Sequence, residues 1–215
     1  MRFLLCVSLI FNFQFSIFNL AHAQWNHLQS GDLLFVSDTS GMGQAVKAST
    51  GIYTHVALVE REGDSLFVID ATPTAGVARQ KFSIFTSHLS PLTFHLYRLT
   101  VPFDTAAVIA RAKSLIGKPY DNAFLPDNDA YYCSELIQEV FNGTQARRLQ
   151  NDGTQASRLQ FESKPMNWRD KEGNLPEYWI KHFEALGMPI PEGVPGTNPT
   201  DLSRSPLLQK IGYGL

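Results

Sequence analysis

The sequence has few cysteines: only Cys6 and Cys133 are present among its 215 residues. Cys6 lies in an N-terminal segment that we expect to be removed, which leaves Cys133 as the only thiol and excludes an intramolecular disulfide. In an oxidising compartment a lone thiol is either a small buried hydrophobe or a reactive nucleophile. Composition alone does not decide between these two roles.

Clusters of basic residues and metal-binding motifs are also missing. The net charge is −2 and no Lys/Arg cluster stands out, which argues against nucleic acid as a partner. The chain contains no HExxH, no CxxC and no His-rich tract, so no metal site is expected. Gly41-Met42-Gly43 lacks the rest of a phosphate-binding loop, and no cofactor is predicted.

The first 23 residues have the features of a signal peptide. Arg2 precedes an apolar run, and Ala21-His22-Ala23 is the small-x-small pattern of a cleavage site. Four polar residues interrupt the run before it reaches the roughly 18 apolar residues of a membrane span, namely Asn12, Gln14, Ser16 and Asn19. We therefore expect export to the periplasm or beyond, with no transmembrane helix left after cleavage.

The rest of the chain, residues 24–215, is long enough for one domain with a sizeable core. Hydrophobic residues make up 44% and aromatic residues 12% of the sequence, which excludes a disordered chain. Apolar or β-branched runs predict strands over 33–36, 55–59, 66–70 and 92–99, and Glu62 to Asp64 predicts a hairpin turn. We expect an α+β fold with an antiparallel sheet.

Helical spacing appears between and after these strands. A helical turn is predicted around 42–47, and Asp104 reads as the N-cap of an amphipathic helix that ends at Gly117. A third helix begins at or just before Cys133, a fourth ends at Gly187, and the Pro/Gly-rich tail over 188–206 is expected to wrap the surface irregularly.

A tandem duplication near 143–162 interrupts the domain. GTQARRLQND begins at Gly143 and GTQASRLQFE begins at Gly153. Two ten-residue copies are too few and too short for a repeat architecture. We interpret them as an insertion at the surface.

Cys133 and His55 are the candidate nucleophile and base. A thiolate is stabilised at the N-terminus of a helix, where Cys133 is predicted. His55 opens a buried strand, whereas His95 lies inside a strand and is better explained as a satisfied, partly buried side chain. Hairpin pairing about Glu62 to Asp64 brings Asp70 within a residue of His55; the alternative is that Asp70 only begins the following turn.

Five motifs together resemble the YiiX-like permuted papain-fold proteins of the NlpC superfamily. They are GDLLFV, THVALVE, VIDATPTAGV, IGKPYD and YYCSELI, between Ser30 and Phe141, with a weaker match in PEGVPGTNPTDL. The order His, acid, Cys is a circular permutation of the papain order. The resemblance implies a thiol amidase or peptidase with a triad of Cys133, His55 and Asp70, although this family often has Glu where Asp70 stands.

The implied mechanism uses His55 to hold a thiolate and the backbone N–H of Cys133 to bind the oxyanion. Tyr120 and Tyr53 are the predicted substrate-binding residues, and a core role for Tyr120 is the alternative. Glu135 fits a structural role in the first helical turn. The substrate stays open between a small peptide or cell-wall fragment and a lipid amide or ester, with acyl transfer or a non-catalytic binding module as other readings; oligomeric state is not predicted.

Overall fold

The computed structural model describes residues 25–89, 94–144 and 159–213. The predicted signal peptide and most of the duplication lie outside these residues. Six antiparallel strands form the main sheet in the order β4-β3-β2-β1-β5-β8. They are β1 (Leu33–Val36), β2 (His55–Glu62), β3 (Ser65–Thr72), β4 (Gly76–Lys81), β5 (Phe94–Leu99) and β8 (Leu208–Tyr213).

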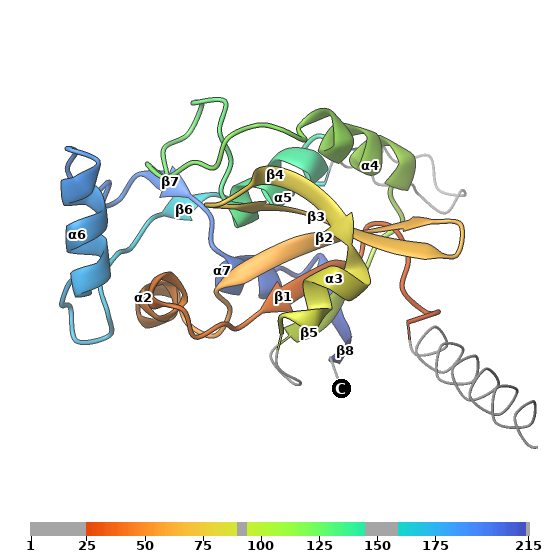
Figure 1. Ribbon diagram of the computed structural model, residues 1–215, viewed down its shortest axis with the longest axis horizontal. Helices are drawn as coiled ribbons and strands as arrows, with labels where there is room; N and C mark the ends of the chain where they lie inside the picture. The colour runs from red at the N-terminus through yellow and green to blue at the C-terminus, as the bar shows by residue number, and fades with distance from the viewer. Residues whose placement is uncertain (1–24, 90–93, 145–158, 214–215) are drawn as a thin grey trace, which may run out of the picture.

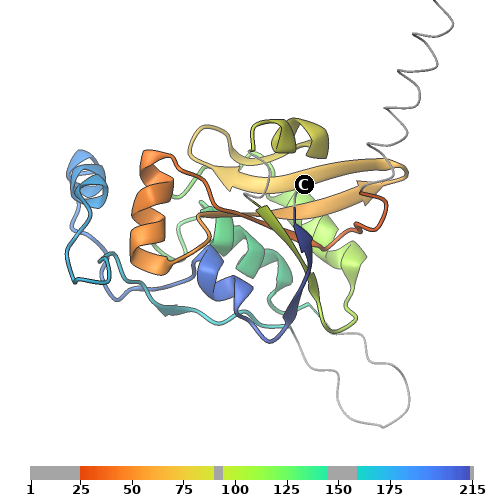
Figure 2. The same cartoon turned by 90° about the horizontal axis from the view of Figure 1, so that it is seen from below.

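Helices cover both faces of this sheet (Figures 1 and 2). Helix α3 (Phe82–Ser87) lies on one face, and α5 (Cys133–Phe141) and α7 (Pro199–Ser203) lie on the other. Alternation along β2 explains the two layers. Val56 and Leu58 pack with α5, whereas Ala57 and Val59 pack with α3.

The other elements surround one end and one side of the sheet. Helices α2 (Gly41–Thr50) and α6 (Glu177–Ala185) lie side by side beyond the end at which β2 begins (Figure 1). Helix α4 (Thr105–Ser114) packs beside α5, and β6 (Lys164–Pro165) pairs with β7 (Pro195–Gly196). Asp104 caps α4, as predicted, by accepting a hydrogen bond from the Ala107 N–H.

The register of the β2–β3 hairpin differs by one residue from the expected one. Leu58 pairs with Ile69, and this register places His55 opposite Thr72 rather than opposite residue 71. Residues two apart on one strand share a face, and therefore Asp70 is a diagonal neighbour of His55 on the same face. The shift of one residue is what makes contact between these side chains possible.

Six regular elements were not predicted, and two of them are the short strands β6 and β7. Strand β4 begins at Gly76, directly after a turn over 73–75. It carries Arg79, Gln80 and Lys81 at the sheet edge, so it lacks an apolar alternation. Helix α3 is only six residues long. The tail over 188–206 is not wholly irregular, because Asn198 caps α7 through the Asp201 N–H, and β8 follows to complete the other sheet edge.

The expected surface insertion is anchored in the core on its C-terminal side. Leu159 and Phe161 are buried in the cluster that contains α5. The Leu159 N–H donates to the Thr144 carbonyl at 2.9 Å, and the Gly143 N–H donates to the Leu159 carbonyl at 3.1 Å. The end of the second copy is therefore part of the packed domain, which corrects the prediction of a wholly external segment.

Candidate active site

The Cys133 thiol stands at the first residue of α5. Tyr132 before it is extended, and the Glu135 carboxylate accepts a hydrogen bond from the Tyr132 N–H at 3.4 Å. Glu135 therefore has the structural role expected of it, and burial followed by repulsion from Asp121 raises its pKa to about 8. The unpaired N–H groups and the dipole of a helix N-terminus favour a negative charge on the sulfur.

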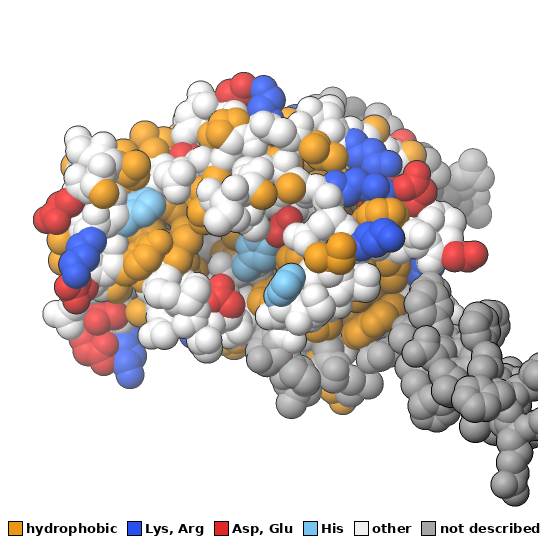
Figure 3. Space-filling view, viewed as in Figure 1, with side chains coloured by type: hydrophobic (Ala, Val, Ile, Leu, Met, Phe, Trp, Pro, Cys, Tyr) orange, Lys and Arg blue, Asp and Glu red, His pale blue; other side chains and the backbone are white. Residues whose placement is uncertain are grey.

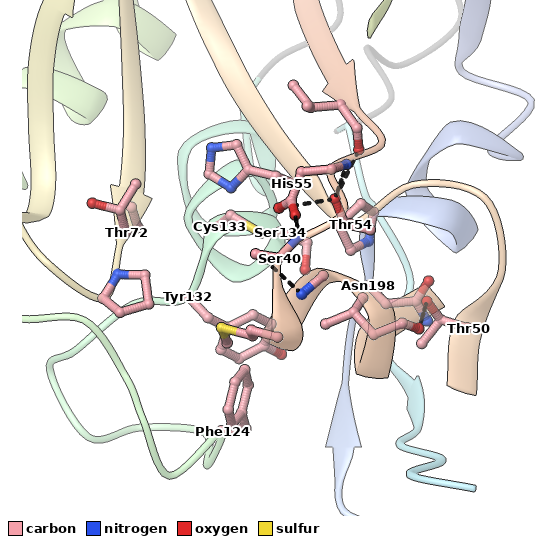
Figure 4. Close-up of a pocket in the computed structure, with 18 of the residues that line it drawn as sticks. Ser40, Thr50, Thr54, His55, Thr72, Phe124, Tyr132, Cys133, Ser134 and Asn198 are labelled. Carbon is pink, nitrogen blue, oxygen red and sulfur yellow. Dashed lines mark hydrogen bonds between the residues drawn. The ribbon is translucent and has the colours of Figure 1, made fainter. Parts of the chain in front are cut away.

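His55 lies between Cys133 and Asp70. Its Nε2 is 2.8 Å from the Asp70 Oδ2, and Figure 4 shows the imidazole beside the Cys133 sulfur. The His55 side chain is 19% exposed and the Asp70 side chain 1% exposed. Burial lowers the pKa of His55, but hydrogen bonds to Asp70 and Cys133 outweigh it and raise the pKa to about 10. This arrangement favours an imidazolium held between two acceptors.

These three residues line a cavity of about 700 Å³. The lining contains polar side chains, among them Asp38, Ser40, Thr54 and Asn198. It also contains many apolar side chains, and Figure 3 shows hydrophobic side chains on the surface between α6 and the sheet. The apolar lining includes Met42, Val46, Phe124, Met166, Trp168, Tyr178 and Trp179.

The two predicted substrate-binding tyrosines lie in different places. Tyr120 lines the cavity, its ring is perpendicular to Phe124, and burial followed by the charge of Cys133 raises its pKa. Tyr53 is buried in the core, where its hydroxyl contacts His95 Nδ1 at 2.7 Å and Tyr97 at 3.1 Å.

The structure therefore does not support a substrate-binding role for Tyr53. Its ring packs 5.3 Å from Phe35, behind the strand end at which His55 stands. Its hydroxyl also supplies the partner expected for His95, because a buried polar group needs a hydrogen bond.

The loop before Cys133 forms a wall of the cavity that the sequence did not reveal. The Asp121 carboxylate accepts hydrogen bonds from the Ala123 and Leu125 N–H groups, at 2.9 and 2.8 Å. Between them Phe124 has a φ of 54°, which is uncommon for a bulky residue. Strained backbone of this kind is often found at functional sites, and here it holds the Phe124 ring between Tyr132 and Trp168.

The C-terminal part of the chain returns to the nucleophile. The Thr197 N–H donates to the Tyr132 hydroxyl at 3.0 Å, and the Ser134 hydroxyl donates to the Thr197 carbonyl at 3.2 Å. A Cβ on Gly196 would lie 2.7 Å from the Met166 sulfur and 2.9 Å from the Tyr132 hydroxyl. The residues on both sides of Cys133 are thus fixed by a segment more than sixty residues later.

Neither a metal centre nor a membrane span is found within residues 25–89, 94–144 and 159–213. No group of three or more His, Cys, Asp or Glu side chains there is placed to hold a metal ion. Over the same ranges no helix has both the length and the apolar character needed to cross a bilayer.

Comparisons with known proteins agree with this geometry. Residues 27–212 match a family described as "Permuted papain-like amidase enzyme, YaeF/YiiX, C92 family". An uncharacterised protein, YiiX of Escherichia coli K12, is 24% identical over 123 residues, which cover 56% of this chain and 61% of YiiX. The chain thus spans less than two thirds of the length of this curated relative.

A solved structure has the same fold. The crystal structure of a protein titled metalloprotein yiiX, from Escherichia coli O157:H7, superposes with a TM-score of 0.67 at 20% identity, covering 86% of this chain and 97% of the other. The permuted papain-like α+β fold expected from the sequence is confirmed. The matching family is described as one of amidases, in agreement with the class of enzyme that the sequence predicts. The chain belongs to the YaeF/YiiX family of permuted papain-like amidases.

Proposed function

We propose that Cys133, His55 and Asp70 form the catalytic triad of an amide hydrolase. The observation that carries this proposal is the position of His55, which hydrogen-bonds the buried Asp70 carboxylate and lies beside the helix-terminal Cys133 thiol (Figure 4). A nucleophile, a base and a group that orients the base are the parts that covalent acyl transfer requires.

The reaction proceeds in two halves. The Cys133 thiolate attacks the amide carbon, and the resulting oxyanion accepts a hydrogen bond from the Cys133 backbone N–H. His55 then gives its proton to the leaving nitrogen, the C–N bond breaks and a thioester remains on the sulfur. In the second half His55 takes a proton from water, the hydroxide attacks the thioester, and the acid leaves as the thiolate and imidazolium are restored.

In this proposal Tyr120 contacts the substrate. Its ring lines the cavity near the sulfur, in the loop that precedes the nucleophile. Because its pKa is raised well above the usual value, the phenol keeps its proton and is available as a donor to the oxyanion or to the substrate.

The substrate is proposed to be a peptide-type amide, with cell-wall peptides as the class that fits export. The polar side chains that line the cavity, including Thr54 and Asn198, offer hydrogen-bonding groups for such a peptide. Export itself rests on the pattern of residues 1–23.

A second candidate is a lipid amide or ester, either hydrolysed or used for acyl transfer. The observation that favours it is the apolar lining of the cavity, because Met42, Trp168 and Trp179 would bury an acyl chain favourably. A non-catalytic module that binds such ligands is the rival to both enzymatic readings.

Turnover assays separate these readings. The purified protein is incubated with muropeptides and with fatty-acyl amides, and amine release is followed for the wild type and Cys133→Ala. We expect release by the wild type on one class and none by the variant. Binding of either class without release by the wild type would support the binding module, and equal release by Cys133→Ala would exclude this thiol as nucleophile.

A further inference from the structure

Helix α3 covers the side of the sheet on which His55 and Asp70 lie. Both residues share this face with Ala57, Val59 and Val68, and Phe82 and Phe85 of α3 pack onto the same group. Figure 2 shows α3 on this face and α5, which carries Cys133, on the opposite face. The base and the nucleophile thus come from opposite layers and meet at the sheet end.

Phe85 is the residue of α3 that touches the base. Its ring lies 6.1 Å from the His55 imidazole, centroid to centroid, with 27° between the planes. Phe85 is 9% exposed and lines the cavity beside the triad. This separation is within the range of stabilising aromatic pairs, and the face of an aromatic ring also attracts a cation such as an imidazolium.

The other contacts of His55 leave its ring plane weakly defined. Asp70 holds the imidazole through its Oδ2 atom alone, because the buried Oδ1 atom has no hydrogen-bond partner in the described part of the chain. The contacts with Asp70 and Cys133 are both made at ring nitrogens, so they permit the ring to rotate about the line that joins these nitrogens. A flat neighbour against the ring removes that freedom and keeps water from the His55–Asp70 bond.

We infer that Phe85 is a positioning residue, whose ring holds the His55 imidazole in the plane that contains both Asp70 and the Cys133 sulfur. The inference rests on the proposed triad. The titratable groups facing His55 are Asp70 from β3 and Cys133 from α5, and His88 and Tyr120 also line the cavity. Phe85 itself carries no charge, so its effect must act through the geometry and solvation of His55.

The test is the pH profile of alkylation of Cys133 by iodoacetamide, measured by mass spectrometry of the peptide that contains it. A small reagent reports on the thiolate without any substrate contact. For Phe85→Leu we expect the pH midpoint of alkylation to rise by roughly half to one unit. At pH values below the midpoint the alkylation rate should therefore be about 3- to 10-fold lower than that of the wild type. Phe85→Tyr keeps the ring and should retain the wild-type profile.

Phe82→Leu is the matched control. Phe82 lies on the same helix and sheet face and is buried, but its ring packs against Trp25. Phe82→Leu should lower the stability by about as much as Phe85→Leu and leave the pH profile of alkylation unchanged. Phe85→Met provides a second variant of suitable volume if thermal melting shows that Phe85→Leu does not fold. In a His55→Ala background, Phe85→Leu should have no further effect.

The outcomes separate the two claims. A wild-type profile like that of a free thiol, with a midpoint near about 8.5, would overturn the triad proposal. A low wild-type midpoint that Phe85→Leu and Phe85→Met leave unchanged would overturn only the role of Phe85. A shift that persists in His55→Ala would show that Phe85 does not act through the imidazole.

Discussion

Replacement of Asp70 by Asn probes the orientation and charge of His55. Asp70 is 1% exposed and accepts its hydrogen bond from His55 Nε2 at 2.8 Å. The substitution keeps the shape but removes the negative charge. A hydrogen bond to a charged partner contributes about 1.5–3 kcal/mol and a neutral one about 1 kcal/mol. We therefore expect Asp70→Asn to lose about 1–2 kcal/mol of stability near pH 6.

The pH dependence of this loss follows from the raised pKa of His55. A pKa of about 10 in the folded protein, against 6.5 for a free histidine, means that the stability from the protonated ring is fully present below pH 6.5. That stability disappears as the pH rises toward 10. The difference between wild type and Asp70→Asn should therefore be largest near pH 6 and shrink toward pH 10.

Urea denaturation at a series of pH values measures the effect, and the loss near pH 6 corresponds to roughly 2–8 °C in melting temperature for a domain of this size. Asp32→Asn is the control. Asp32 is fully buried and pairs with Arg98 at 2.7 Å. Because Arg98 stays charged from pH 6 to 10, the stability lost in Asp32→Asn should be the same across this range. An Asp70→Asn loss that is equally constant from pH 6 to 10 would refute a protonated His55 beside Asp70.

Three further predictions concern catalysis, the cavity and the duplication. Cys133→Ala and His55→Ala should each remove nearly all turnover, and the double variant should be little worse than either single one, because the two groups act as a unit; additive losses would argue against this. If the apolar lining binds the acyl chain of a lipid amide, Val46→Lys should lower acyl-amide turnover at least 10-fold and change muropeptide turnover little. An equal loss of turnover on both substrates would exclude selective binding of the acyl chain at Val46. Deletion of residues 149–158 should leave the melting temperature within a few degrees, whereas Leu159→Ala should cost about 2–4 kcal/mol, since Leu159 is buried; a larger effect of the deletion in thermal melts would show that those residues pack.

The sequence was most informative where function depends on local order along the chain. A single thiol at a helix start and a histidine at a strand start singled out Cys133 and His55, and the hairpin turn over Glu62 to Asp64 placed Asp70 near His55. The family resemblance joined Cys133 to these two residues. The predicted hairpin register was wrong by one residue. Glu62 pairs with Ser65, so the turn consists of Gly63 and Asp64 and is centred between them, whereas the prediction centred it on Gly63. These local signals identified His55 and Asp70 but not the residues around them.

The cavity walls depend on contacts between distant segments. Trp168 lies in irregular chain and Trp179 lies in α6, and Thr197 reaches Tyr132 across 65 residues of sequence. No periodicity marks such contacts. Adjacency to His55 in sequence does not bring Tyr53 next to it in space, because the chain turns into β2 between them and the Tyr53 ring enters the core.

The most direct test of the triad needs no substrate. The ultraviolet absorbance of a thiolate is measured across pH as the difference between the wild type and Cys133→Ala. An imidazolium beside the sulfur predicts a thiolate signal already at pH 6–7 that is lost in His55→Ala until the pH approaches about 8.5. A wild-type signal that appears only near that value, with or without His55, would contradict the triad.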